Sequence, residues 1–383
     1  MRVRRLELVD FRNYETGCLE LGAGLTAVLG ANGQGKSNLI EAVAYLATLE
    51  SFRGVPGAAL VREGCDRGIV RAEVEQTDGR VVSIECELHA AGRDRVLVNK
   101  QRLGRASELL GVVRTTVFSP EDLALVKDGP SVRRRFLDQT VIGLHPRLDA
   151  DRRDLERILR HKATLLKQMG GRSNEETAFT LDVWNSKLAE VGDTVGRARA
   201  ELVVALAPEV GQAYHDLTSR PVPDGGAGRI AGDGGVAGNG GVAGDGGVRV
   251  TYAPLWRQVG LATALEAARD EEVRRQVCLV GPHRDDLDLD LNGLPARTHA
   301  SQGEQRTLAL ALRLAAHRLV TERVGSAPIL LLDDVFSELD GDRSAALLAH
   351  LPHGQVLLTT AGPLPEGARP ERVVRVEGGR LLA

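Results

Sequence analysis

The octapeptide Gly30–Ser37 constrains the fold of this chain more than any other feature, because it matches the phosphate-binding pattern G-x-x-x-x-G-K-[ST]. The run Leu25–Leu29 before it is typical of a buried strand, and Asn38–Leu49 after it has the apolar period of a helix. Glycines let the backbone N–H groups and the helix N-terminus face phosphate oxygens. We therefore predict a nucleoside triphosphate site. Its residues are Gly30, Ala31, Asn32, Gly33, Gln34, Gly35, Lys36 and Ser37.

The chemistry of this loop assigns separate roles to its last two residues. The Lys36 ammonium would reach the β- and γ-phosphates of ATP, and the Ser37 hydroxyl would hold Mg²⁺. We predict Lys36 as a catalytic as well as a binding residue.

A second acidic motif follows the apolar run Ile329–Leu332, which reads as a central parallel strand covered on both faces. Asp333 and Asp334 end this strand. Asp333 is predicted to orient Mg²⁺ or its waters, and Asp334 to polarise the attacking water as the catalytic carboxylate. The alternative is a pair of surface acids in a turn, which leaves the apolar strand unexplained.

Ser301–Gln305 precedes the apolar helix Arg306–Val324. Ser301 and Glu304 form a capping box, which is one interpretation. The other is an anion site, because a helix start offers free N–H groups and a positive dipole end. In an ABC-type ATPase head, whose motif order this chain follows, Ser301, Gln302 and Gly303 would close on the ATP of a second copy. The order therefore predicts an ATP-dependent homodimer.

Four stretches make the chain similar to the RecF family of bacterial recombination mediators, which are related to the SMC ATPases. They are Phe11–Tyr14 with the phosphate loop, Pro120–Asp138, Gly281–Leu287 and Leu331–Asp340. The resemblance implies an ATP-dependent DNA-binding protein that acts at gapped DNA. It also implies action with RecO and RecR to load RecA, and a γ-phosphate contact from Arg12. Aromatic residues, on which unpaired bases stack, are few, which favours duplex or junction DNA as the target.

Two positions depart from the wider ABC pattern. Ser119-Pro120-Glu121 stands where a glutamine is usual, and Thr359-Thr360-Ala361 stands where a transporter head carries a histidine. Groups that position water and sense the γ-phosphate are thus replaced, so we predict slow hydrolysis that serves as a switch.

The predicted fold class is α/β: an ABC-type P-loop ATPase head, with a mixed sheet and flanking helices, interrupted by a mainly helical second lobe. The predicted boundaries are 1–118 for the first half of the head, 119–276 for the lobe and 277–383 for the second half. Both halves must meet in one sheet because both hold the same nucleotide.

Within the lobe, apolar periodicity predicts two antiparallel helices of about 25 to 30 residues each, or about 40 Å. The first would span Arg147–Met169, and the seam of the second would run from Leu181 to Leu202. Residues 224–247 hold 12 glycines and a six-residue repeat. Such a segment cannot bury enough apolar surface to offset its backbone entropy, so we predict a disordered insert.

Composition favours a soluble cytoplasmic protein. No apolar run approaches the roughly 20 residues that span a bilayer. Cys18, Cys65, Cys86 and Cys278 show no metal-ligand or redox spacing, which predicts reduced thiols. The formal net charge of −3 means that any DNA site must be a local patch. The predicted patch consists of Arg133, Arg134, Arg135, Arg152 and Arg153, although these arginines could instead pair with nearby aspartates.

Two questions stay open at the level of sequence. His283–Asp286 offers possible metal ligands, but no second His or Cys completes a site, and the role of Gly281–Leu287 is not derivable. The nucleotide-binding subunit of a transporter is the alternative function, and a DNA-processing nuclease is a third. A transporter head would require the switch histidine, which is replaced here. A nuclease would require a further carboxylate or His cluster besides Asp333 and Asp334, and none is evident in the sequence.

Overall fold

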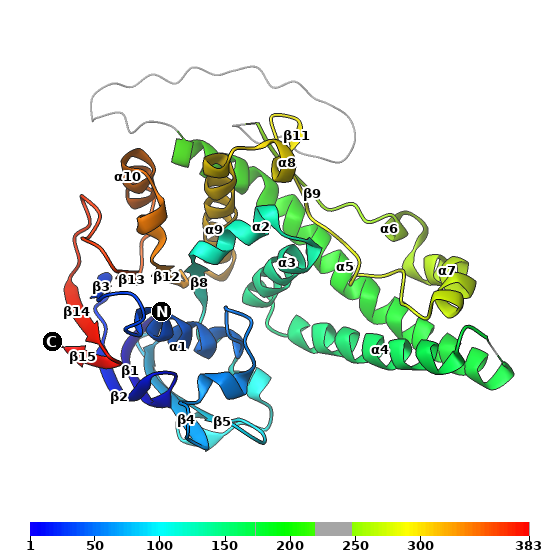
Figure 1. The fold of residues 1–383 in the computed structure, drawn as a ribbon, viewed down its shortest axis with the longest axis horizontal. Coiled ribbons are helices and arrows are strands. Elements are labelled where there is room, and N and C mark those ends of the chain that lie inside the picture. Colours follow the sequence, from blue (N-terminus) through cyan, green and yellow to red (C-terminus); the bar gives the residue numbers. More distant parts are fainter. Residues whose placement is uncertain (173, 219–246, 383) are drawn as a thin grey trace. The chain divides into compact units, whose positions relative to one another are not determined.

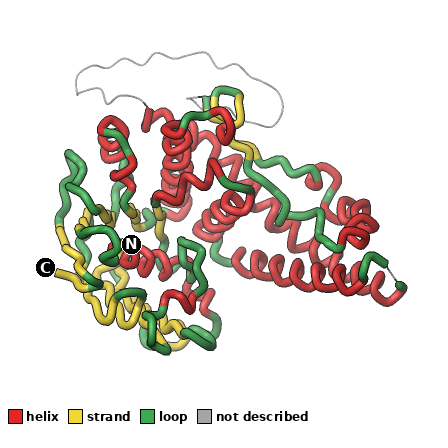
Figure 2. The backbone as a smooth tube through the Cα atoms, in the orientation of Figure 1, coloured by secondary structure: helices red, strands yellow, loops and turns green. Residues whose placement is uncertain are grey.

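The computed structural model describes residues 1–172, 174–218 and 247–382 (Figure 1). These residues form two compact units. The first contains 1–123, 209–218 and 301–382, and the second contains 124–172, 174–208 and 247–300. Strands dominate the first unit and helices the second (Figure 2).

An antiparallel sheet of six strands begins the first unit, in the order β2-β1-β4-β5-β6-β7. Along β4 every second residue from Gly68 to Val74 is buried, so one face lies against the core and the other carries charged side chains. The strands are β1 (Arg2–Phe11), β2 (Tyr14–Glu20), β4 (Arg67–Glu75), β5 (Val81–His89), β6 (Arg95–Val98) and β7 (Gln101–Arg102).

A second sheet of six strands, in the order β15-β14-β3-β13-β12-β8, unites segments that are distant in the sequence. Five of its strands run parallel and β15 is antiparallel, so the sheet is mixed as predicted. The five residues of β12 are all buried, as the apolar run indicated. The strands are β3 (Leu25–Leu29), β8 (Thr115–Phe118), β12 (Ile329–Asp333), β13 (Val356–Thr360), β14 (Arg372–Glu377) and β15 (Arg380–Leu382).

Helix α1 (Lys36–Thr48) fills the core of this unit. Its Leu39, Ile40 and Val43 are fully buried in one cluster with residues of both sheets, including Leu6 of β1 and Leu331 of β12. The other elements of this unit are the 3₁₀ turns η1 (Gly57–Leu60), η2 (Ala106–Leu109), η3 (Pro120–Leu123) and η4 (Val335–Glu338), with helices α9 (Gln302–Val324) and α10 (Gly341–Ala349).

The second unit is mainly helical. Helices α4 (Leu148–Met169) and α5 (Glu175–Thr218) pack side by side through Leu155, Ile158, Leu188 and Val195 (Figure 1). Its other elements are α2 (Ala124–Lys127), α3 (Pro130–Leu144), α6 (Trp256–Val259), α7 (Leu261–Arg275), α8 (Ala296–His299) and the sheet of β9 (Val248–Thr251), β10 (Asp288–Leu291) and β11 (Leu294–Pro295).

The length predicted for the second helix was wrong. Helix α5 has 44 residues and continues through Pro208, and its last residues, 209–218, belong to the first unit. At 1.5 Å per residue it spans about 66 Å. A proline inside a sequence pattern usually indicates a helix end, but here the helix accommodates it.

The segment Gly281–Leu287 forms the polar centre of the second unit. Arg133 of α3 donates to both carboxylate oxygens of Asp286, at 2.7 and 2.8 Å. Arg199 of α5 donates to the Pro282 carbonyl oxygen at 2.7 Å. The carboxylate of Asp285 accepts from the Trp256 indole at 2.7 Å and from the Tyr252 hydroxyl.

These bonds give the segment a structural role that the sequence left open. They also hold residues 277–300 in the second unit, although the predicted boundary assigned them to the head.

Four further predictions concern the glycine-rich insert, the cysteines, a metal site and membrane-spanning helices. The predicted disordered insert, 224–247, lies outside the described residues except for Gly247. The four cysteines are free. Among the described residues, no group of three His, Cys, Asp or Glu is placed to hold a metal ion, and the ring of His283 lies 3.2 Å from the Cys278 carbonyl oxygen. In the same residues no helix is both long and apolar enough to cross a membrane.

Candidate nucleotide-binding site

The predicted phosphate loop connects β3 to α1, as its sequence requires. Gly33 and Gly35 adopt φ angles of 79° and 115°, which residues with a side chain rarely adopt. A Cβ at Gly30 would lie 2.4 Å from the Val376 carbonyl oxygen, so only glycine fits there. Lys36 is 5% exposed, and its Nζ donates to the carbonyl oxygens of Gly30 and Ala31 at 2.8 and 2.9 Å. These two hydrogen bonds therefore hold the Lys36 ammonium inside the curve of the loop.

Residues of the Phe11–Tyr14 motif brace this loop from one side. Asn13 Nδ2 donates to the Gln34 carbonyl oxygen at 2.9 Å, and the Tyr14 hydroxyl donates to the Gly35 carbonyl oxygen at 3.0 Å. Across the loop, the Gly379 N–H donates to the same Gln34 oxygen at 3.0 Å. Because strand ends fix both sides, the loop is preorganised.

The phosphate loop and the acidic motif at the end of β12 meet at one hydrogen bond. Ser37 Oγ donates to Asp333 Oδ1 at 2.7 Å, although the two residues are 296 positions apart. Thr359 Oγ1, in the segment Thr359-Thr360-Ala361 at the end of β13, donates to the same carboxylate oxygen at 2.8 Å. A hydroxyl and a carboxylate in contact are the oxygen ligands that Mg²⁺ prefers. The predicted metal residues, Ser37 and Asp333, are thus brought together.

The two carboxylates after β12 have different environments. Burial raises the pKa of the Asp333 carboxyl, while the hydrogen bonds from Ser37 and Thr359 act in the opposite direction. Asp334 has a left-handed backbone with φ of 51°, and its N–H donates to the Thr359 carbonyl oxygen at 3.1 Å. Its Oδ1 is buried without a hydrogen-bond partner among the described residues. An unpaired buried carboxylate oxygen can accept a proton from a water molecule.

Arg12 is engaged elsewhere in this structure. Its guanidinium makes two 2.8 Å hydrogen bonds to the fully buried Glu41 of α1, and a third, of 2.9 Å, to the Ala59 carbonyl oxygen. These bonds position α1. A γ-phosphate contact by Arg12 stays a prediction, and it would require this pair to open.

Arg53 is a site residue that the sequence did not reveal. Its Nη2 lies 3.9 Å from Asp333 Oδ2, and its Nη1 donates to Asn38 Oδ1 at 3.1 Å. It therefore brings a cation to the edge of the predicted metal site. The arginine lies in an irregular segment without a motif, so only its basic character could have marked it.

The segment after β8 carries acids in place of the expected glutamine. The charge of Glu121 contributes to the raised pKa of Asp333, after the larger effect of burial. Asp122 is buried and accepts two hydrogen bonds from Arg313 of α9, at 3.0 and 2.7 Å. This pair ties the end of β8 to the helix that begins with the predicted signature.

Ser301 is the N-cap of α9, and the predicted capping box is present. Its Oγ accepts from the Glu304 N–H at 3.3 Å, and Glu304 Oε2 accepts from the Ser301 N–H at 2.7 Å. Ser301 and Gln302 are exposed. A Cβ at Gly303 would lie 2.9 Å from Arg343 Nη1, so glycine admits this guanidinium. The capping interpretation and the predicted contact with a second copy are compatible.

The arginines predicted to contact DNA are largely engaged within the second unit. Arg133 is 5% exposed and bonded to Asp286, so it cannot reach a phosphate and the prediction is wrong for this residue. Arg134 donates to the Asp285 carbonyl oxygen at 2.7 Å. Arg152 and Arg153 pair with Asp149 at 3.0 and 2.8 Å. DNA contact by Arg134, Arg135, Arg152 and Arg153 stays a prediction.

A phosphate loop and an acidic strand end on one mixed sheet, with a capped signature helix, define an ABC-type P-loop ATPase head. The family model for the RecF/RecN/SMC N-terminal domain matches residues 2–361. The chain belongs to this family and, within it, to the RecF proteins. The predicted fold class, an ABC-type head interrupted by a mainly helical lobe, is thereby confirmed.

Individual relatives support this assignment. The DNA replication and repair protein RecF of Streptomyces avermitilis is 42% identical, with 94% of this chain and 93% of the relative covered. The protein of the same name from Kineococcus radiotolerans is also 42% identical, with 98% and 97% covered.

Solved structures agree. A structure of the recombination mediator protein RecF with ATPrS, in the RecFOR pathway, matches with a TM-score of 0.85 at 27% identity, covering 99% of this chain and 97% of that one. An Smc head bound to the C-winged helix domain of ScpA matches with a TM-score of 0.56 at 16% identity, covering 100% and 96%, and so shares the fold alone.

Proposed function

We propose that this chain is an ATP-dependent DNA-binding protein that acts as a recombination mediator at gapped or junction DNA, with RecO and RecR, to help load RecA. Its relatives are named as DNA replication and repair proteins, and a matching structure is of RecF in the RecFOR pathway. The main observation that supports ATP binding is the 2.7 Å hydrogen bond between Ser37 and Asp333. Cytoplasmic localisation stays a prediction from the sequence.

The site supports binding and slow hydrolysis of ATP. The loop amides and Lys36 would hold the phosphates, and Ser37 and Asp333 would hold Mg²⁺, which neutralises phosphate charge. Asp334 would polarise the attacking water through its unpaired Oδ1. Thr359-Thr360-Ala361 stands where a transporter head carries the switch histidine, and Ser119-Pro120-Glu121 stands where a glutamine is usual, which favours weak turnover used as a switch.

A homodimer would complete the site. The exposed start of α9, with Ser301, Gln302 and Gly303, offers N–H groups and a positive dipole end to the γ-phosphate bound by a second copy. In one chain this helix start is already tied to the loop after Asp334, because Arg306 pairs with Glu338 at 3.1 Å. Closure on the partner's nucleotide would therefore act on the chain's own catalytic carboxylate.

The test is ATP turnover with and without duplex or gapped DNA, combined with electrophoresis of that DNA. We expect DNA to stimulate turnover and to remain intact. Cleavage of the DNA would favour the nuclease alternative. Turnover indifferent to every DNA would oppose the mediator proposal.

A further inference from the structure

The hairpin of β6 and β7 carries a concentration of positive charge that no motif in the sequence marks. Residues 93–105 contain five basic side chains and one acid, Asp94, in a chain whose net charge is −3. All five are exposed: Arg93, Arg95, Lys100, Arg102 and Arg105. Such an excess in an acidic chain is a local electrostatic feature.

The hairpin is fixed to the sheet. Asn99 and Lys100 form its two-residue turn, with φ angles of 50° and 64°, between the paired residues Val98 and Gln101. The Asn99 N–H donates to the Ser83 carbonyl oxygen at 2.8 Å, and the Ser83 N–H donates to Asn99 Oδ1 at 3.0 Å. A ligand that binds here would not have to order the backbone first.

Strand geometry places several of these cations on one face. Arg102 lies opposite Leu97, and Leu97 lies opposite Glu85, so they share the outer face of the sheet. Arg95, two residues from Leu97, points to the same face, since side chains alternate along a strand.

Three of the cations are available to a ligand. Within the part of the chain that the structure describes, Arg93, Lys100 and Arg102 make no ion pair and no side-chain hydrogen bond. The single acid of the segment, Asp94, is exposed and accepts from the His89 N–H at 2.9 Å, so five basic side chains and one acid leave the segment with four net positive charges.

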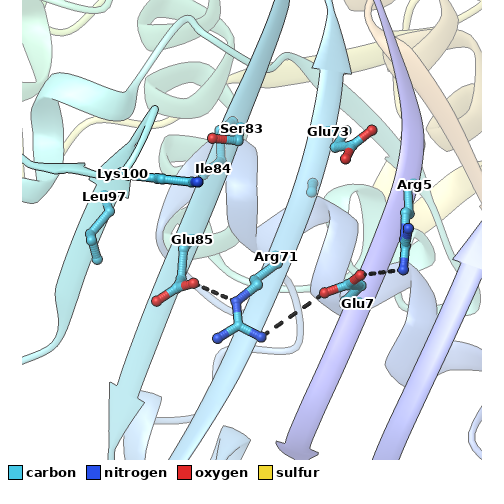
Figure 3. A pocket seen from close by; sticks show the side chains of 10 residues that line it. Arg5, Glu7, Arg71, Glu73, Ser83, Ile84, Glu85, Leu97 and Lys100 are labelled. Carbon is cyan, nitrogen blue, oxygen red and sulfur yellow. Dashed lines mark hydrogen bonds and ion pairs between the residues drawn. The ribbon is translucent and has the colours of Figure 1, made fainter.

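The neighbouring hollow on the same sheet is different, as Figure 3 shows. There Arg71 lies between Glu85 and Glu7, and Arg5 pairs with Glu7 at 2.6 Å. The arginines of this hollow, which has a volume of about 260 Å³, are thus neutralised, and only Lys100 at its rim has no partner among the described residues. Among the cations that line this hollow, the one without an ion pair therefore belongs to the hairpin, and the acid Glu73 also lines the hollow without an ion pair among the described residues.

We propose that the 93–105 hairpin binds the phosphate backbone of duplex DNA. The inference rests on the proposed DNA-binding function and gives it a surface in place of Arg133. Arginine and lysine recognise phosphate oxygens by charge-assisted hydrogen bonds. The segment contains no aromatic residue on which unpaired bases could stack, so a duplex fits it better than a single strand.

The experiment compares the salt dependence of duplex binding for two triple variants. The first carries Arg93→Gln, Lys100→Gln and Arg102→Gln. The matched control carries Arg257→Gln, Arg323→Gln and Arg369→Gln, which are also exposed and remove the same charge. We expect the hairpin variant to lose about 0.9 units of log–log slope for each phosphate contact, or about 2.7 for three. The control should keep the parental slope, and both should bind ATP normally.

The outcomes separate this inference from the proposal on which it rests. If the parent protein binds no duplex, the proposed function fails. If the parent binds with a steep salt slope and the hairpin variant keeps it, the DNA proposal stands and the hairpin is not its surface. The cations would then serve to prevent edge-to-edge pairing of β7 or to bind an acidic protein.

Discussion

Ser37 and Asp333 show how much of this site depends on single side chains. Their 2.7 Å hydrogen bond joins the phosphate loop to the end of β12, which Asp334, the predicted catalytic carboxylate, follows directly. Lys36 and Asp334 lie next to these residues in sequence and have distinct chemistry, one a cation across the loop and the other an unpaired carboxylate. Substitutions at the two positions should therefore have different effects.

Replacing Lys36 by alanine should abolish tight ATP binding without unfolding the protein. The change removes a charge-assisted contact of about 2–3 kcal/mol, or roughly 30- to 150-fold in affinity. Titration with a fluorescent ATP analogue measures the loss, and thermal unfolding checks the fold. Lys167→Ala, at an exposed position of α4, is the control and should bind as the parent does. Parental affinity in a folded Lys36→Ala protein would refute the assignment of the loop.

Replacing Asp334 by asparagine should leave Mg·ATP bound but slow its hydrolysis by about 10²- to 10⁴-fold, because the attacking water loses its base. Single-turnover measurement with excess protein separates this effect from binding. Turnover at the parental rate would show that Asp334 is not the catalytic carboxylate.

Elements were predictable where their signal is local. The strand Leu25–Leu29 has the predicted bounds, and the helix predicted over Arg147–Met169 is present as Leu148–Met169, because short segments determine them. Long-range partners were not predictable. Arg133 pairs with Asp286, which is 153 positions away, and its basic neighbours in sequence suggested DNA instead. Arg53 lies beside the predicted metal site, although it belongs to an irregular segment without a motif. Helix α5 extends beyond the apolar seam predicted for it and contains Pro208 in its interior.

The polar centre of the second unit makes its own prediction. Asp285→Ala removes the acceptor of Tyr252 and Trp256 and should destabilise this unit by about 3 kcal/mol. The only two tryptophans, Trp184 and Trp256, lie in this unit, so their fluorescence in urea reports on it. Asp270→Ala, at an exposed position of α7, is the control. Equal midpoints for the two variants would contradict the role given to Asp285.

At the scale of the whole molecule, the chain combines a mixed-sheet head with a helical unit and a glycine-rich segment between α5 and β9. Deleting residues 225–246 should change thermal stability and ATP binding little, because loop-closure entropy varies slowly with length. Calorimetry and nucleotide titration measure both quantities. Loss of folding on deletion would show that the segment is structured.

The central claim is that ATP joins two copies of this chain through the start of α9. Ser301→Arg places bulk and charge at that helix start without altering the phosphate loop. Thr77→Arg, at an exposed turn between β4 and β5, adds the same charge elsewhere and is the control.

Light scattering with and without ATP measures the mass of each protein directly. We expect the parent and Thr77→Arg to become dimers with ATP, whereas Ser301→Arg should bind ATP and stay monomeric. A Ser301→Arg protein that dimerises with ATP as the parent does would contradict the claim.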